Sequence, residues 1–440
     1  MKIDSVAHSE KATVGHAGLS LIGEMARISG LDEACLGITR KKQPQIADAD
    51  ILRSLCGLIA QGKTDFDHIR QFAGDSFFQA ALEINRTPSA EILRQRFQEM
   101  SAHPDFEKKI QQCAIKVGQK IGVNPEVTTI GENRWIRLDV DITVFDNADT
   151  KKEGAAPTYD RRYGFAPIFA HLGGGFMVGS RLRPGNAHSY TSGTKEFIAE
   201  SIQNARRLVE DPLLLVADGG FDSQDLIRFL LDQQTDFIIK HNRRQESKTE
   251  WLQAAKQHGH VVRSTTDKTV YQGSVYKHIR DVDDPVRMVF EVTEIHSTDG
   301  QLLFAPEVIV FAAWTNLKAD EKHILKAYRD RGTSEQYHAE FKSELNMERL
   351  PSGKLSVNSA FLKMGMLVYN MFKIVGQDMV ISRSLGLKKA TRRRMKTVMN
   401  SVIYMCGRIT RHARRAVLHL ACPKPWYRFF SNLFCRLQAA

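Results

Sequence analysis

The most regular alternation of apolar and polar residues in the chain extends from Trp135 to Phe145. A period of two is that of a β-strand, whose successive side chains point to opposite faces. One face of this predicted strand is apolar and consists of Ile136, Leu138, Val140, Ile142 and Val144. The opposite face carries Asp139, Asp141 and Thr143. Because acidic residues are disfavoured in the middle of strands, two aspartates on one face indicate a functional role.

A second predicted strand is the apolar run Leu213–Ala217, which ends directly before Asp218. A short apolar run bounded by turn signals is typical of a fully buried strand. Sites in open α/β sheets form at the carboxyl ends of strands, so Asp218 is a candidate site residue. The alternative is that Asp218 belongs to a turn or caps a helix, although Asp222 is the better candidate for the cap.

The remaining elements near these aspartates predict a fold. Strand-like segments at 163–172 and 176–183 are joined by three consecutive glycines, which indicates a hairpin. The next elements are a helix at 192–209, the Asp218 strand, a helix at 223–232 and a strand at 236–240. Three antiparallel strands followed by helix, strand, helix and strand is the arrangement of ribonuclease-H-like two-metal nucleases. In such a fold, three acids from separate elements can hold two divalent cations.

A third candidate carboxylate lies late in the chain. Tyr328, Arg331, Glu335 and Lys342 are spaced so that one continuous α-helix would place them within an arc of about 60°. A glutamate between an arginine and a lysine can bind a divalent metal while the two cations hold a phosphate beside it. The alternative is a solvated amphipathic helix with ion pairs between neighbouring turns.

These motifs together resemble the DDE transposases of bacterial insertion sequences, in the group marked by a Tyr-(2)-Arg-(3)-Glu-(6)-Lys signature. Asp141-Ile142-Thr143 matches the first Asp-x-Thr of that family, and Asp218 in Val-Ala-Asp-Gly matches the second aspartate. The ambiguous position is Asp139, a second acid on the same strand face. We favour Asp141 as the first ligand because its threonine follows two residues later.

The loop at 183–189, Arg-Pro-Gly-Asn-Ala-His-Ser, also resembles a stretch found in one subgroup of this family. It contributes Arg183, Asn186 and His188 as candidate DNA-binding residues. From the signature, the resemblance adds Tyr328, Arg331 and Lys342, which would contact phosphates next to the scissile bond.

The resemblance implies a transposase that cleaves DNA at transposon ends and transfers the strands to target DNA. Asp141, Asp218 and Glu335 would be catalytic and would hold two Mg²⁺ (or Mn²⁺) ions. The implied partners are double-stranded DNA, both terminal inverted repeats and target, and a second copy of the chain in a homodimeric synaptic complex. The implied location is the bacterial cytoplasm, associated with the nucleoid. Two alternatives stay open: a ribonuclease-H-like nuclease that never joins DNA, and a non-catalytic DNA-binding protein derived from a transposase.

The interval between Asp218 and Glu335 is too long for one crossover connection. It contains four strand-like runs, at 261–264, 269–278, 286–295 and 308–314, which predict a β-rich insertion. In related enzymes an aromatic residue of this insertion can stack on a flipped base, and Trp314 is our candidate for that role. The alternative is that Trp314 is a core residue of its strand.

The expected fold class is therefore α/β, with a ribonuclease-H-like mixed sheet flanked by helices. We expect a β-rich insertion, an α-helical N-terminal domain and a basic helical C-terminal tail in addition. The expected regions are a helical DNA-binding region (1–125), the first part of the catalytic core (130–244), the insertion (245–312), the second part of the core with the Glu335 helix (313–377) and the basic helical region (378–440).

Charge supports a polyanionic partner. The formal net charge is +12, and no acidic residue follows Asp378, whereas 14 lysines and arginines do. The basic runs at 388–396 and 408–415 have helical spacing, and the first contains Arg392, Arg393 and Arg394 as candidate DNA-binding residues. A solvated helix face and a membrane-surface helix are the alternatives. We expect no membrane-spanning segment, because no apolar stretch reaches the roughly 18 residues required, and we expect no ATP site, because no glycine-rich nucleotide loop is present.

Overall fold

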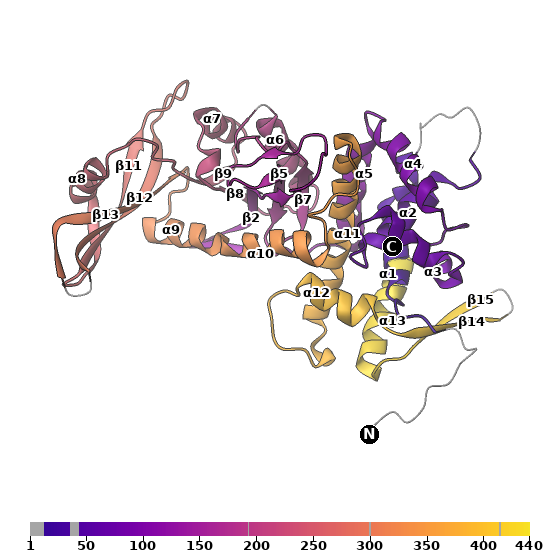
Figure 1. Ribbon diagram of the computed structural model, residues 1–440. Helices are drawn as coiled ribbons and strands as arrows, with labels where there is room; N and C mark the ends of the chain where they lie inside the picture. The colour runs from indigo at the N-terminus through magenta and orange to yellow at the C-terminus, as the bar shows by residue number, and fades with distance from the viewer. Residues whose placement is uncertain (1–12, 36–43, 192, 299–300, 413–414) are drawn as a thin grey trace. The chain divides into compact units, whose positions relative to one another are not determined.

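The computed structural model describes residues 13–35, 44–191, 193–298, 301–412 and 415–440 (Figure 1). The chain divides into two compact units. One unit comprises residues 125–144 and 156–337, and the other comprises residues 1–124, 145–155 and 338–440. The first is called the sheet unit and the second the helical unit.

The sheet unit is built on five central strands. They are β2 (Asn133–Ile142), β6 (Ile168–Leu172), β7 (Met177–Arg181), β8 (Leu213–Ala217) and β9 (Asp236–Lys240). Their order across the sheet is β9-β8-β2-β6-β7. Strands β2, β6 and β7 are antiparallel neighbours, whereas β8 is parallel to β2 and β9 is parallel to β8. This confirms the predicted succession of three antiparallel strands followed by helix, strand, helix and strand, and the structure adds that the last two strands are parallel to β2.

Short-range features of the sequence explain much of this arrangement. Gly174 and Gly175 have φ angles of 82° and 93°, which L-residues with side chains rarely adopt, so they permit the turn before β7. Helix α6 (Thr194–Arg206) packs against β7, β6 and β2, and helix α7 (Gln224–Asp232) packs against β9. Strand β8 is buried over its whole length, as its continuous apolar run predicts.

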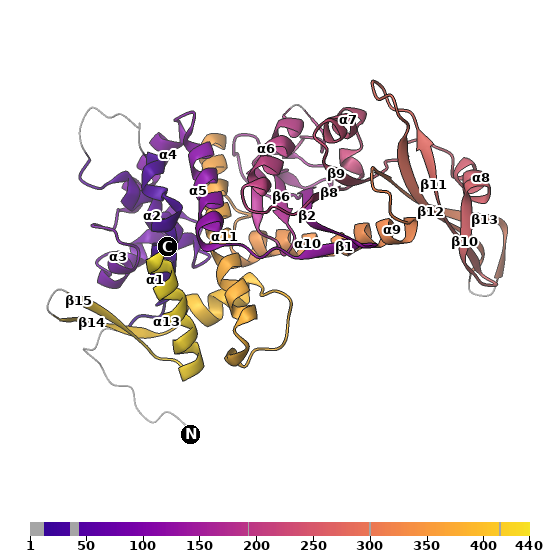
Figure 2. The same ribbon diagram turned by 180° about the vertical axis from the view of Figure 1, so that it is seen from behind.

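The predicted β-rich insertion is also confirmed. It consists of helix α8 (Lys248–His258) and the strands β10 (Gly259–Ser264), β11 (Lys268–Lys277), β12 (Val286–Thr298) and β13 (Gln301–Thr315). These strands form an antiparallel meander whose last strand pairs with β9, with Trp314 opposite Ile239. With β1 (Val127–Ile130) paired to β2, insertion and core therefore form one ten-stranded sheet. Helix α8 lies over β11, β12 and β13 in both views (Figures 1 and 2).

The N-terminal part of the helical unit has the predicted helical structure in its described residues. Its helices are α1 (Leu19–Ser29), α2 (Asp48–Ile59), α3 (Ser76–Ala81), α4 (Ala90–Ser101) and α5 (Phe106–Ile121), together with 3₁₀ turns at Leu31–Cys35 and Phe66–Phe72. They surround α11 (Leu355–Ile381), which packs against α5, α2 and α4. The side chain of Asn370 on α11 donates to the carbonyl of Ala114 on α5 at 3.1 Å, which satisfies a buried polar group.

The predicted basic helical C-terminal region is only partly helical. After α12 (Met395–Val398) and a π turn (Met399–Ile403), the chain forms a hairpin of β14 (Gly407–His412) and β15 (Arg415–Leu420) before α13 (Lys424–Ala439). The helical prediction for the second basic run was therefore wrong, and the first run, 388–396, is helical only from Met395 onward. The physical reason is that helical spacing of charges is a weak signal, whereas β-branched residues such as Ile409 and Val417 favour strands. In the described part of the chain, no helix combines the length and the apolar character that crossing a bilayer requires.

Candidate active site

Asp141 and Asp218 lie at the same edge of the sheet. Strands β2 and β8 are parallel neighbours in which Val140 is opposite Ala217, so the aspartates that follow these two residues are adjacent. Burial raises the pKa of Asp218, and the negative charge of Asp141 raises it further. The two carboxylates are therefore close enough to repel each other, and this part of the predicted site is brought together by the fold.

Asp218 also begins a short 3₁₀ turn, Gly219–Phe221. Its Oδ1 accepts a hydrogen bond from the backbone N–H of Gly220 at 3.0 Å. Asp218 therefore has the turn or cap role that the sequence left open, and it also lies next to Asp141. The hydrogen bond holds the carboxylate in one orientation at the end of β8.

Arg331 is the cation that faces this pair. Its guanidinium lies 3.0 Å from Oδ2 of Asp141 and donates to the carbonyl of Val140 at 3.2 Å. Burial alone would lower the pKa of Arg331, but the neighbouring acids, Asp141 first, offset this and raise it. A permanently charged arginine therefore neutralises part of the acidic edge. The phenol of Tyr328 is close to Arg331 and its ring packs on Phe311 of β13, with 5.0 Å between the centroids.

Asp139 has a different environment from Asp141. It is fully buried, and Nε of Arg137 donates to its Oδ2 at 2.8 Å. Burial raises the pKa of Asp139, an effect that Arg137 opposes. Because this carboxylate is enclosed with an arginine, whereas Asp141 is partly exposed, the structure favours Asp141 as the residue available to a ligand.

The four signature residues do not lie on one continuous α-helix, so that prediction was wrong. Tyr328 ends α9 (Glu321–Arg329), Arg331 is in a 3₁₀ turn (Asp330–Gly332), Glu335 is in α10 (Thr333–Ala339) and Lys342 is in a π turn (Glu340–Glu344). Glycine weakens a helix, and Gly332 follows an arginine that is tied to β2. These two features explain the interruption after α9.

Glu335 is exposed on α10, and none of the interactions found in the described residues joins it to Asp141 or Asp218. Within the same residues, no group of three acidic, histidine or cysteine side chains is arranged to hold a metal ion. The structure thus brings together Asp141, Asp218, Arg331 and Tyr328 but does not group Glu335 with them. Lys342 belongs to the helical unit, where its Nζ lies 3.0 Å from a carboxylate oxygen of Glu348.

The loop at 183–189 is held beside the Asp218 turn. The buried guanidinium of Arg183 donates to the carbonyls of Ala166 and His188, both at 3.0 Å, so Arg183 holds the loop in place. Burial lowers the pKa of Arg183 to about 10. Gly185 has no room for a side chain, because a Cβ there would lie 2.2 Å from the Ala156 carbonyl oxygen.

The exposed residues of this loop are the ones that remain available to a ligand. Ser189 packs so closely on Gly220 that a Cβ at Gly220 would be 2.3 Å from its hydroxyl oxygen. Asn186 and His188 are exposed on the same loop. The loop therefore presents two polar side chains near the turn that carries Asp218.

The opposite end of the Asp218 turn is anchored by Asp222, a feature that the sequence analysis missed. One carboxylate oxygen of Asp222 accepts from the indole of Trp314 at 2.9 Å. The other lies 2.8 Å from Nδ1 of His241 and accepts from the N–H of Asn242 at 2.8 Å. Asp222 therefore does not cap α7, the role considered from the sequence. Its position four residues after Asp218 was the only sequence signal available.

Trp314 is 5 % exposed, and its indole is engaged with Asp222. This agrees with the core alternative for Trp314. Its ring also makes an edge contact with the imidazole of His241, with centroids 5.7 Å apart. A residue of the insertion thus helps to fix the turn that carries Asp218.

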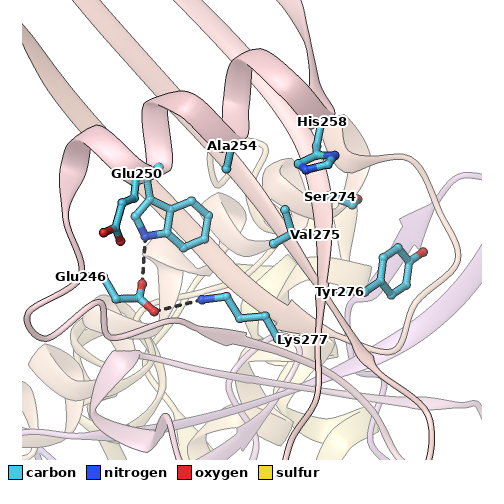
Figure 3. A pocket seen from close by; sticks show the side chains of 9 residues that line it. Glu246, Glu250, Ala254, His258, Ser274, Val275, Tyr276 and Lys277 are labelled. Carbon is cyan, nitrogen blue, oxygen red and sulfur yellow. Dashed lines mark hydrogen bonds and ion pairs between the residues drawn. The ribbon is translucent and has the colours of Figure 1, made fainter.

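His241 links Asp222 to a second carboxylate. Its Nε2 lies 2.9 Å from Glu246, which also accepts from Trp251 of α8 at 2.8 Å and pairs with Lys277 of β11 at 2.9 Å. Glu246 and Lys277 are among the residues that line a pocket between α8 and β11 (Figure 3). Burial alone would lower the pKa of His241, but Asp222 and Glu246 outweigh burial and raise it.

This arrangement predicts a pH-dependent stability. A raised pKa means that charged His241 stabilises the fold at pH values below its ordinary pKa of about 6.5, and that this contribution is lost as the pH rises through the raised pKa. We expect His241→Gln to lower the free energy of unfolding by about 1–3 kcal/mol near pH 6 and to flatten its decline at higher pH. Denaturant unfolding at several pH values measures this.

The matched control is His323→Gln, since His323 is a more exposed histidine that lies 3.8 Å from Asp320. We expect this control to unfold like the wild type. An unchanged pH slope in His241→Gln would contradict the proposed bridging role of the imidazolium.

Comparison with known proteins gives a family match over nearly the whole chain and distant similarity to solved structures. The chain is similar to a piggyBac transposase in a cryo-EM structure of its synaptic complex with hairpin DNA, with 10% sequence identity and a TM-score of 0.42. That similarity covers 98% of this chain and 85% of the other. No curated protein sequence matches the chain. The model of a family described as transposase DDE domain, group 1, matches residues 5–440. Because this match extends over nearly all of the 440 residues, the chain belongs to the DDE transposase family.

Proposed function

We propose that the protein is a DNA transposase of the bacterial insertion-sequence type that cleaves DNA at transposon ends and joins the freed 3′ ends to target DNA. The observation that carries this proposal is the convergence of Asp141 and Asp218 at one sheet edge, with Arg331 against them. Its proposed partners are terminal inverted repeats, target DNA and a second copy of the chain.

The chemistry of the site fits divalent cations. Carboxylate oxygens are the ligands that Mg²⁺ prefers, and the repulsion between Asp141 and Asp218 would be relieved by a bound cation. Asp141, Asp218 and Glu335 would hold two Mg²⁺ or Mn²⁺ ions. When bound, these ions would activate the attacking water or 3′-hydroxyl and stabilise the leaving oxygen.

Arg331 has two roles in this proposal. Its ion pair with Asp141 tethers the start of α10 to β2, and Glu335 follows one helical turn later along the chain. Arg331 is fixed at the aspartates, and Glu335 is only four residues away from it in the sequence. The tether would therefore limit how far the third carboxylate can move from the other two. Its Nε is buried without a hydrogen-bond partner among the described residues, so a phosphate oxygen that entered the site would find a donor there.

The other residues of the chain orient the substrate. Tyr328, packed on Phe311, would present its hydroxyl beside Arg331 to the same phosphate. Asn186 and His188 would contact the DNA backbone near the Asp218 turn, because they are exposed on the loop that Arg183 holds there. The hydrogen bond from Gly220 and the Asp222 anchor would keep Asp218 in place during the reaction.

Neutral substitutions of the three acids test the catalytic assignment. We expect Asp141→Asn, Asp218→Asn and Glu335→Gln each to reduce cleavage of an end-containing DNA by about 10³-fold or more, because each removes a ligand charge. Binding of the same DNA should persist in a mobility-shift assay. The control is Asp232→Asn, an exposed acid on α7 that should leave cleavage unchanged. Full cleavage by any of the three active-site variants would refute the assignment of that residue.

A second assay separates the transposase from a nuclease that never joins DNA. Purified protein is given a pre-cut donor end with a free 3′-hydroxyl, a target duplex and Mg²⁺. We expect a joined product of donor and target, since the same site would activate the 3′-hydroxyl for attack. Cleavage of uncut donor without any joined product would instead establish the nuclease alternative, and binding without either reaction would establish the non-catalytic one.

A further inference from the structure

The turn Glu340–Glu344 of the helical unit is π-helical and carries Lys342. The N–H of Leu345 donates to the carbonyl of Glu340 at 3.1 Å, which is the bond between residues five apart that defines such a turn. π turns are rare in helices and are common at functional sites. Because a π turn changes the direction in which its side chains project, whatever stabilises it also decides where Lys342 points.

Two carboxylates of this turn are held by the basic segment that precedes and begins α12. Glu340 is fully buried and forms an ion pair with Arg392. Glu344, one turn later, forms an ion pair with Arg394 and accepts from the N–H of Lys396 at 2.7 Å. The segment 392–396 therefore grips both ends of the turn, and α12 packs against the turn and against α11 (Figure 1).

Lys373 of α11 gives Glu340 a second cationic partner at 3.2 Å. Burial lowers the pKa of Lys373 to about 8, an effect that Glu340 opposes, so Lys373 loses its charge only as the pH rises above neutral. The guanidinium of Arg392 stays charged at every pH at which the protein is folded. It is therefore the permanent counter-charge of the buried Glu340. Removing one partner of such a buried pair leaves an uncompensated charge, which disrupts the local structure.

The same turn is held on its apolar side by Phe341. This buried ring stacks on Phe145, with 6.4 Å between centroids, and makes an edge contact with Tyr369 of α11 at 5.7 Å. Lys342 projects from the turn and its side chain is 14% exposed, next to Glu348. The packing of Phe341 thus holds the turn on which Lys342 lies.

We propose that Arg392 and Arg394 are positioning residues, which fix the π turn Glu340–Glu344 and thereby the direction of Lys342. This inference rests on the proposed function, and it adds to that function the phosphate contact by Lys342 that the signature implies. Their place in a basic run had suggested that the two arginines are direct phosphate ligands. The proposal instead gives them a role within the protein, in which they hold the π turn.

A double-mutant cycle with the full-length protein tests the proposal. The variants are Lys342→Ala, Arg392→Ala and the double variant, and cleavage is measured at saturating end-containing DNA. We expect Lys342→Ala and Arg392→Ala each to reduce the rate by about 10- to 100-fold. The double variant should be no slower than Lys342→Ala alone, because Arg392 acts through Lys342. The matched control is Lys389→Ala, which removes an exposed charge from the same run and should leave the rate unchanged.

The dependence of DNA affinity on salt distinguishes positioning from direct contact. Loss of a phosphate ligand lowers the DNA affinity and reduces the slope of log affinity against log salt concentration, called the salt slope here. Loss of a positioning residue instead lowers the cleavage rate at saturating DNA, with little change in the affinity or in the salt slope. A reduced salt slope in Arg392→Ala with an unchanged saturated rate would overturn the proposal. Additive rate losses in the double variant, or a wild-type rate in Lys342→Ala, would do so as well.

Hydrogen exchange of the segment 340–348 gives a readout that does not depend on catalysis. We expect faster exchange at the Leu345 amide in Arg392→Ala and no change in Lys389→Ala. If the wild-type protein cleaves no DNA, the proposed function fails, and the exchange result still decides whether Arg392 holds the turn. Arg392→Gln, which retains a hydrogen-bond donor to Glu340, replaces Arg392→Ala if the latter does not fold.

Discussion

The ion pair between Arg331 and Asp141 is the contact on which the candidate active site depends. Two aspartates at the ends of parallel neighbouring strands repel each other, and partial burial strengthens the repulsion. The guanidinium of Arg331, 3.0 Å from Asp141, offsets this charge. It also joins the turn after α9 to β2, so one contact both stabilises the acidic edge and brings the signature segment to it.

The second determinant is the anchoring of the Asp218 turn from its far end. Asp222 receives hydrogen bonds from Trp314 on β13 and from the backbone after β9, and it contacts His241. The insertion therefore does more than extend the sheet: through Trp314 it contributes a donor to the turn that carries a candidate catalytic residue. Its pairing with β9 places that indole, which gives a physical reason for a continuous ten-stranded sheet.

Basic residues of the C-terminal region form ion pairs that hold parts of the helical unit together. Arg392, Arg394 and Arg436 form ion pairs with Glu340, Glu344 and Asp378 respectively, all within the helical unit. A run of basic residues without acidic neighbours along the chain thus has acidic neighbours in space. The local sequence therefore overstates the positive charge that is not already paired within the protein.

The sequence by itself determined the order of strands and helices along the chain, the position of the insertion and the two aspartates at one edge, because periods of two and buried apolar runs are local properties. Three-dimensional contacts decided the rest. That Asp139 is enclosed with Arg137, that Trp314 faces Asp222, and that Arg392 pairs with Glu340 all depend on residues far apart in the chain. The signature spacing predicted one helix, but the tether at Arg331 and the buried Glu340 divide it into four segments. Helical periodicity describes only a chain's own backbone, and it contains no information about the partners that bend it.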